Sequence, residues 1–257
     1  MSASRLVVAT VNTYLGRTIK TPRGLAPLAR ADVILMQELF SPAAYGVETS
    51  LQDVGFDLVA AEGHSGLGIA VRSDSAYRNA GQPVRSTVLE QAGRAERVML
   101  SKFSREPLEY SDLGVLAAQL DGPGGHRLVV VTTHLPVVIA FRQRARFLSR
   151  LSLELADPYY DGSLVLTGDM NHWPGPRKAD LAFRRRAGFA AVDLGQDITW
   201  PSRRTDRAEK TVNRVVGGQL DDILYRPGAM QCVQQEVVHV ASDHRAVMAT
   251  FTITTTA

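Results

Sequence analysis

Residues 164–171 read Leu-Val-Leu-Thr-Gly-Asp-Met-Asn, a short apolar run that ends in a carboxylate and an amide. An apolar run of this length, bounded by turn-forming residues, is typical of a strand buried on both faces. The pattern recurs at 128–134, Leu-Val-Val-Val-Thr-Thr-His, and at 6–12, Leu-Val-Val-Ala-Thr-Val-Asn. Because each run ends in a polar side chain, we predict buried strands whose ends gather reactive groups.

Further runs rich in Val, Ile and Leu extend this pattern along the chain. The predicted strands cover residues 6–11, 33–36, 68–71, 113–120, 128–133, 164–167, 219–225 and 245–253. The clearest helix is predicted over 138–153, and the residues assigned to its core-facing side are Phe141, Ala145, Leu148 and Ser152. The predicted class is therefore α/β, with helices packed outside sheets.

Length and composition set the limits of the architecture. With 257 residues, of which 45% are hydrophobic, the chain can bury a large core, and one domain over residues 1–257 is expected. Cys232 is the only cysteine, which excludes an intrachain disulfide and a thiolate-rich metal site. A metal must therefore be held by oxygen or imidazole groups. The formal charge of +3 and the pI of about 9.2 favour an anionic partner.

The sequence contains no apolar run of the length that crosses a membrane. Its first residues, Met-Ser-Ala-Ser-Arg, also lack the apolar stretch of a secretory signal. A cytoplasmic location is therefore expected.

Two polar stretches resist assignment to a strand or helix. Residues 73–107 and 200–218 are predicted to be long loops or hairpins, which are either functional or simply solvated connections. The first stretch carries Arg94 and Arg97, which would contact substrate if the loop folds over a site.

Polar groups cluster at the ends of the predicted strands. Taken singly, each has an ordinary structural explanation, such as a turn former, a surface carboxylate or a capped turn. Their joint occurrence is what indicates a site. The residues are Asn12, Glu38, His134, Asp169, Asn171, Asp221, Asp243 and His244.

The order of motifs resembles that of the endonuclease/exonuclease/phosphatase superfamily, the DNase I-like group, along nearly the whole chain. The motifs are Thr-Val-Asn, Gln-Glu, Gly-Ile-Ala, Thr-Thr-His-Leu, Gly-Asp-Met-Asn, Leu-Asp-Asp-Ile-Leu and Ser-Asp-His. The resemblance implies a four-layer α/β/β/α sandwich, in which helices flank two packed mixed sheets. It places the site at one end of the sheets.

The resemblance also implies a divalent metal, Mg²⁺ or Mn²⁺, held by hard oxygen ligands. By matching motif positions, Glu38 is the principal metal ligand, with Asn12 beside it and Asp243 as a further contributor.

The remaining motif positions imply catalytic roles. Asp169 would position or deprotonate a water, and Asn171 would hold that water or the phosphate. His244 would bind the phosphate and transfer a proton, while Asp221 fixes the tautomer of its ring. His134 would be a second imidazole that donates to the phosphate or to the leaving group.

Two features depart from the family pattern. Asp222 stands where relatives commonly have an aromatic residue, so a shift of one position would make Asp222 the partner of His244. We favour Asp221, because its apolar neighbours then match the usual positions. His172 and Trp173 directly follow Asn171 and either line the substrate pocket or, for Trp173, pack against the sheet edge.

The predicted helix carries a basic stripe. Arg142, Arg146 and Arg150 recur at helical spacing, with Arg144 beside them. We interpret the stripe as a solvated helix face in preference to a groove that follows a phosphate backbone.

The favoured function is a metal-dependent phosphodiesterase, which cleaves a P–O bond in a nucleic acid, a nucleotide or a phospholipid-like ester. A phosphomonoesterase acting on a small phosphorylated metabolite would use the same core. A catalytically silent binding module and a structural Ca²⁺ site are the alternatives from other classes. Every matched motif position keeps a reactive side chain, which favours an enzyme.

Overall fold

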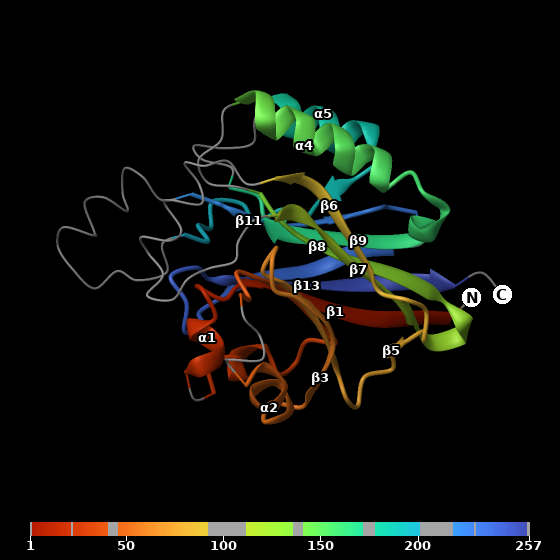
Figure 1. Cartoon of the computed structure of the whole chain (residues 1–257). Helices are drawn as coiled ribbons and strands as arrows, with labels where there is room; N and C mark the ends of the chain where they lie inside the picture. Colours follow the sequence, from red (N-terminus) through yellow and green to blue (C-terminus); the bar gives the residue numbers. More distant parts are fainter. Residues whose placement is uncertain are drawn as a thin grey trace.

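The computed structural model describes residues 2–21, 23–40, 46–91, 112–135, 141–171, 178–200, 218–228 and 230–255. Two packed β-sheets form the centre of the molecule, and helices cover the outer face of each sheet (Figure 1). The predicted sandwich of two mixed sheets flanked by helices is therefore confirmed.

We call the sheet that contains the first strand the N-sheet. In spatial order it comprises β12 (Met230–Val238), β13 (Ala246–Thr255), β1 (Ser2–Asn12), β2 (Val33–Gln37), β4 (Leu67–Arg72) and β3 (Phe56–Glu62). Helices α1 (Arg17–Lys20) and α2 (Val47–Gln52) cover its outer face (Figure 1).

The other sheet is called the M-sheet. Its order is β10 (Ala190–Ala191), β11 (Asp221–Tyr225), β9 (Ser163–Asp169), β8 (Arg127–His134), β7 (Asp112–Asp121) and β5 (Arg78–Asn79), and β6 (Arg85–Gln91) also pairs with β7. Helices α4 (Phe141–Glu154) and α5 (Lys178–Arg186) cover its outer face (Figure 1). Among the described residues, no helix is long and apolar enough to cross a membrane.

Burial on both faces explains why the central strands read as continuous apolar runs. In β8, Leu128 and Val130 belong to the core between the sheets, whereas Val129 and Val131 belong to the core beneath α4 and α5. Successive side chains of a strand point to opposite faces, so an unbroken apolar run fills two cores at once.

The eight predicted strands are all present, with bounds that differ by only a few residues. The prediction missed β3 and β12, which lie at the edges of the N-sheet and mix polar with apolar residues. It also left residues 73–107 without a definite strand, and within the described part of that stretch β6 forms an antiparallel pair with β7.

The predicted core face of the long helix was correct for Leu148 and wrong for Ala145 and Ser152, and the Phe141 side chain lies outside the described part of the chain. Ala145 is exposed and Ser152 only half-buried, whereas Phe147, Leu148 and Leu151 are buried against the M-sheet. The prediction that the arginines of this helix form a solvated face is also corrected in part. Arg146 and Arg150 are exposed as predicted, but Arg144 is 2% exposed.

Strand directions explain why the motif residues meet. The parallel strands β1 and β2 end together, with Asn12 opposite Gln37, and the parallel strands β8 and β9 end with His134 opposite Asp169. Because β11 runs antiparallel to β9, its first residue, Asp221, also lies opposite Asp169.

A polar contact joins the two sheets beneath this edge. The Gln37 side chain donates from Nε2 to Thr132 Oγ1 over 2.8 Å, and both side chains are fully buried. The strand ends that carry the site are thus held at a fixed separation.

Candidate active site

Asp169 lies at the centre of the site and is 1% exposed. Its Oδ1 accepts the Asn171 backbone N–H over 3.0 Å, and its Oδ2 accepts the Asn12 Nδ2–H over 3.1 Å. Asn171 has a left-handed backbone with φ of 48°, and its side chain donates to the Leu135 carbonyl. These bonds fix the carboxylate and the turn that follows it.

The preceding residue, Gly168, permits close approach of β8 and β9. A Cβ at this position would lie 2.0 Å from the Thr133 carbonyl oxygen. A side chain larger than hydrogen would therefore push the two strands apart next to His134 and Asp169.

Glu38 directly follows β2 and has a φ of 54°. Its Oε1 accepts Asn12 Nδ2–H over 2.9 Å, and its Oε2 accepts the Leu15 backbone N–H over 3.1 Å. Tyr14 and Leu15 themselves have positive φ values of 51° and 54°. This left-handed turn after β1 directs a backbone N–H at the carboxylate.

The Asn12 amide is held in one orientation by these neighbours. Its nitrogen faces the carboxylates of Glu38 and Asp169, and its Oδ1 accepts the Tyr14 backbone N–H over 2.9 Å. Asn12 thus lies beside Glu38, but here it acts as a donor to carboxylates.

His244 and Asp221 form a buried pair. The ring Nδ1 lies 2.9 Å from Asp221 Oδ2, and the other ring nitrogen, Nε2, lies 3.7 Å from Asp169 Oδ2. The Thr199 hydroxyl accepts the Asp221 backbone N–H. Ser242 Oγ accepts the His244 backbone N–H and donates to the Asn12 carbonyl. This hydroxyl joins the segment before β13 to the end of β1.

Asp222 faces the opposite side of β11. Its Oδ2 lies 2.7 Å from Arg184 Nη2 of α5, and its Oδ1 accepts a hydrogen bond from Gln219 over 3.0 Å. The partner of His244 is therefore Asp221, and the acidic residue in the usual aromatic position is explained by a buried ion pair with a helix.

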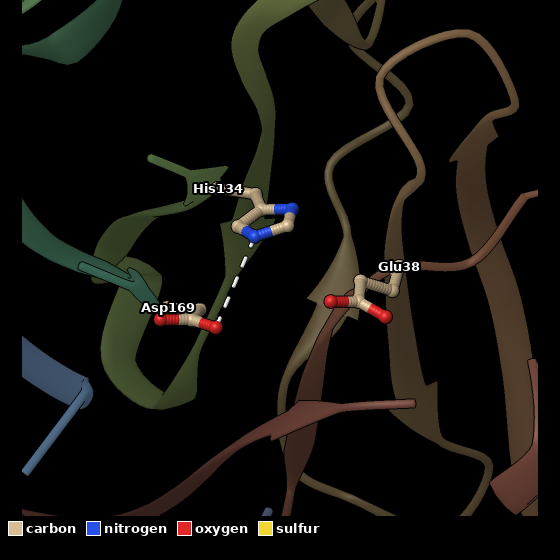
Figure 2. Close-up of side chains that lie close together, drawn as sticks. All are labelled: Glu38, His134 and Asp169. Atoms are coloured by element: carbon tan, nitrogen blue, oxygen red, sulfur yellow. Dashed lines mark ion pairs between the residues drawn. The ribbon is translucent and has the colours of Figure 1, made fainter. Parts of the chain in front are cut away.

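His134 faces Asp169 from the end of β8 (Figure 2). Its Nε2 lies 3.8 Å from Asp169 Oδ2, a distance too long for a hydrogen bond. The ring is 3% exposed, and neither nitrogen has a hydrogen-bond partner among the described residues. Burial, reinforced by the charge on His244, lowers the pKa of His134 to about 4, so this imidazole is neutral at pH 7.

The other titratable groups also influence one another. Burial raises the pKa of Asp169, His244 opposes the rise, and Asp221 and Glu38 add to it. Burial lowers the pKa of His244, but Asp221 and Asp169 outweigh this effect and the net shift is upward. Burial, with a contribution from Glu38, raises the pKa of Asp243. The site thus concentrates carboxylates that repel one another.

Two groups of side chains in the described residues could hold a cation. One ligand atom from each of Glu38, His134 and Asp169 lies within 4.8 Å of the others, and the same holds for Asp169, Asp221 and His244. Asp221 and His244 already pair with each other, so the first group fits a cation better (Figure 2). Its oxygen and imidazole donors, including the unpartnered His134 nitrogens, suit a divalent metal.

Four predicted site residues cannot be located, and two groups that contribute to the site were not predicted. Arg94, Arg97, His172 and Trp173 lie outside the described residues. Sequence reasoning did not foresee the backbone N–H groups of the turn after β1, since they leave no side-chain pattern. It also missed the Thr199 hydroxyl, which lies far from any motif in the sequence.

Comparisons with known proteins agree with this geometry. A sequence profile described as the Endonuclease/Exonuclease/phosphatase family matches residues 6–244. No significant match is found among curated proteins.

Solved structures of similar fold include two phosphatases and a protein bound to DNA. D. rerio TDP2 complexed with single strand DNA product is 19% identical, with a TM-score of 0.67, 96% of this chain covered and 99% of that chain. Mannosyl-6-phosphatase Bt3783 of Bacteroides thetaiotaomicron VPI-5482 is 15% identical, with a TM-score of 0.64 and coverages of 96% and 99%.

The third is the inositol polyphosphate 5-phosphatase domain of SPsynaptojanin in complex with inositol (1,4)-bisphosphate and calcium ion. It is 16% identical, with a TM-score of 0.62 and coverages of 98% of this chain and 85% of that chain. At these identities the structural likeness establishes a shared fold, and the profile match over most of the chain establishes descent. The chain belongs to the endonuclease/exonuclease/phosphatase family.

Proposed function

We propose that this protein is a divalent-metal-dependent phosphodiesterase that cleaves a P–O bond by in-line attack of water. The proposal rests on the groups that surround the Asp169 carboxylate. Its Oδ2 accepts a hydrogen bond from Asn12 and lies 3.8 and 3.7 Å from the Nε2 atoms of His134 and His244. A carboxylate facing two imidazoles can move protons at a phosphate ester.

Mg²⁺ or Mn²⁺ would be held by Glu38, close to Asp169 and His134, since one ligand atom of each lies within 4.8 Å of the others. Asn12 and Asp243 remain predicted contributors from motif position. When bound, the metal supplies charge neutralisation at the phosphoryl oxygens.

The protein's own groups would divide the proton transfers. Asp169 orients the attacking water and accepts its proton. His244, kept protonated by Asp221, donates Nε2–H to the departing alkoxide. His134 is neutral, so it offers one N–H to a phosphoryl oxygen. Asn171 lies at the end of the same turn as Asp169 and would hold the phosphate.

Charge balance favours a diester over a monoester. Within the described ranges, the contacts of the candidate catalytic and metal-binding side chains run to one another and to neighbouring polar groups, and none of them involves a lysine or arginine. A phosphomonoester brings a charge of about −1.5 to −2 at neutral pH, whereas a diester brings roughly one negative charge less. The diester therefore suits a site that already contains several carboxylates. Nucleic acid, nucleotide and phospholipid-like esters remain the candidate substrates, and the DNA product bound to TDP2 supports including the first.

The test is a panel of substrates incubated with Mg²⁺, Mn²⁺ or EDTA. The panel contains bis-p-nitrophenyl phosphate, p-nitrophenyl phosphate, single-stranded DNA and a sphingomyelin analogue. We expect metal-dependent cleavage of the diesters, lost in Glu38→Ala and in His244→Ala. Faster cleavage of the monoester would replace the diesterase assignment with a phosphomonoesterase. Absence of turnover on every substrate, in a folded protein that binds metal, would count against catalysis and favour a binding module.

A further inference from the structure

Arg144 is a charged side chain buried in the core between α4 and the M-sheet, with 2% exposure. Its Nε and Nη2 donate to the same oxygen of Asp180 on α5, over 2.9 and 2.7 Å. Its Nη2 also donates to the backbone carbonyl of Met170 over 2.6 Å. One guanidinium thus joins two helices and the end of a strand.

Met170 is the residue between Asp169 and Asn171. On the sheet side, its N–H donates to the Leu220 carbonyl over 2.7 Å, and the Asp169 carbonyl accepts the Leu135 N–H over 2.9 Å. The Met170 carbonyl is bound by Arg144. The turn that carries both candidate catalytic side chains is therefore held from β8, from the segment before β11 and from α4.

The turn requires support because it is strained. Asn171 has a φ of 48°, a conformation that side chains other than glycine adopt at an energetic cost. Such a conformation persists only where the surroundings determine it. The Met170 carbonyl lies one residue from this strain, so its hydrogen bond to Arg144 acts directly on the turn.

Helix packing alone does not account for an arginine here. A buried ion pair rarely stabilises a fold more than apolar residues of similar volume, because both charges lose their hydration. Arginine offers several donors in a planar fork, so it can bind a carboxylate and a carbonyl at the same time. The hydrogen bond to the Met170 carbonyl is a contact that apolar side chains could not make.

We propose that Arg144 is a positioning residue, which sets the geometry of Asp169 and Asn171 through the Met170 carbonyl. Asp180 holds the guanidinium in the orientation that reaches this carbonyl. The proposal rests on the proposed phosphoesterase function, since it assigns these side chains to the reacting phosphate and water.

The test compares three variants of the whole chain. Arg144→Leu combined with Asp180→Leu removes both charges, so that neither is left unpaired in the core. Arg144→Lys keeps a cation beside Asp180 but loses the planar fork. Arg72→Leu serves as the control, because Arg72 also pairs with a carboxylate, Asp32, and its hydrogen bonds and ion pairs within the described ranges do not involve the turn.

The measurements are kcat and KM with bis-p-nitrophenyl phosphate, the melting temperature, and ¹⁵N spectra of the histidine rings without substrate. In the double variant we expect kcat to fall about 10-fold to 100-fold, since small misplacements of catalytic groups have effects of that size. KM should change less than kcat. The ring signals of His134 and His244 should move, and Arg144→Lys should recover part of kcat.

Other outcomes would overturn the proposal. Unchanged kcat and unchanged ring signals in the double variant would leave Arg144 with a purely structural role. Equal losses of kcat and melting temperature in the double variant and in Arg72→Leu would point to general destabilisation. If the double variant does not fold, Arg144→Lys decides between these results. If the wild type cleaves no ester, the phosphoesterase proposal fails, and the ring signals still show whether Arg144 shapes the site.

Discussion

His134 shows at the scale of one residue how a site can oppose stability. Its imidazole is buried and neutral, and both ring nitrogens lack a hydrogen-bond partner in the described structure. An unsatisfied buried polar group costs about 1 to 3 kcal/mol. A ring kept in this state is more readily explained by a ligand that it meets during function than by folding.

Replacing His134 by Leu should therefore stabilise the fold and impair turnover. We expect the free energy of unfolding to rise by about 1 kcal/mol, because the unpaired nitrogens are removed. We expect kcat to fall about 100-fold, the loss typical when one hydrogen-bond donor to the transition state is removed. Chemical denaturation and diester hydrolysis measure the two effects.

Thr167→Val provides the matched control. The Thr167 hydroxyl is also buried and has no hydrogen-bond partner in the described part of the chain, but it belongs to no motif. This substitution should leave turnover unchanged. A loss of stability in His134→Leu together with normal turnover would show that His134 is a structural residue.

The motif residues could be singled out from sequence because each lies at or next to one end of an apolar strand, and Asp221 could be preferred to Asp222 from its apolar neighbours. The role of Arg144 could not be foreseen. A long arginine side chain at helical spacing resembles its solvated neighbours in sequence, and only the three-dimensional position of Asp180 and Met170 explains its burial.

At the scale of elements, the β3–β4 hairpin supports the turn that carries Glu38. The Leu39 N–H donates to the Gly66 carbonyl of this hairpin over 2.8 Å. The hairpin loop is closed by Glu62, whose carboxylate accepts the backbone N–H groups of His64 and Ser65 over 3.0 and 2.6 Å.

Glu62→Gln should destabilise the protein at neutral pH and much less in acid. Burial raises the pKa of Glu62, but the hydrogen bonds from Ser65 and His64 outweigh it and the net shift is downward. A carboxyl with a lowered pKa in the folded state stabilises the fold above its unfolded pKa, near 4.3, and loses this contribution as the pH falls through the folded pKa.

We expect the melting temperature of Glu62→Gln to lie about 2 to 4 °C below that of the wild type at about pH 7. The difference should shrink toward zero at about pH 3. Asp57→Asn is the control, since Asp57 is an exposed carboxylate of the same hairpin. A difference that stays constant with pH would show that the Glu62 charge contributes nothing.

Strands buried on both faces were predictable, and edge strands were not. Val33–Gln37 is buried throughout and forms an unbroken apolar run up to its last residue. In Met230–Val238, by contrast, several side chains are exposed and polar residues interrupt the apolar pattern. The pairing partner, β13, is what makes this segment a strand, and hydropathy does not reveal a partner.

At the scale of the whole molecule, the site lies across the seam between the two sheets. Asn12, Glu38 and His244 come from the N-sheet side, whereas His134, Asp169 and Asp221 come from the M-sheet. The order of motifs in the sequence was enough to predict which side chains belong to the site. The distances between them follow from the packing of one sheet on the other, which sequence does not specify.

Binding of a divalent metal should therefore stabilise the entire fold. A cation relieves repulsion among the carboxylates, and at about 100 times its dissociation constant a ligand adds about 2.7 kcal/mol. We expect Mg²⁺ or Mn²⁺ to raise the melting temperature by roughly 5 to 10 °C relative to EDTA.

Glu38→Gln should lose most of this rise, and sodium chloride of equal ionic strength should not reproduce it in the wild type. An equal rise in Glu38→Gln would place the metal elsewhere in the molecule. Differential scanning calorimetry measures each case.

The pairing of β1 with β13 also affects how the protein is made. Ser2 lies opposite Thr255 and Thr10 lies opposite Val247 (Figure 1). During synthesis β1 therefore has no pairing partner on this side until β13, more than two hundred residues later, has been made. His244 immediately precedes this late strand. A growing chain on the ribosome therefore contains most of the site's side chains before His244 and β13 have been synthesised. The candidate site is therefore complete only when translation has passed β13.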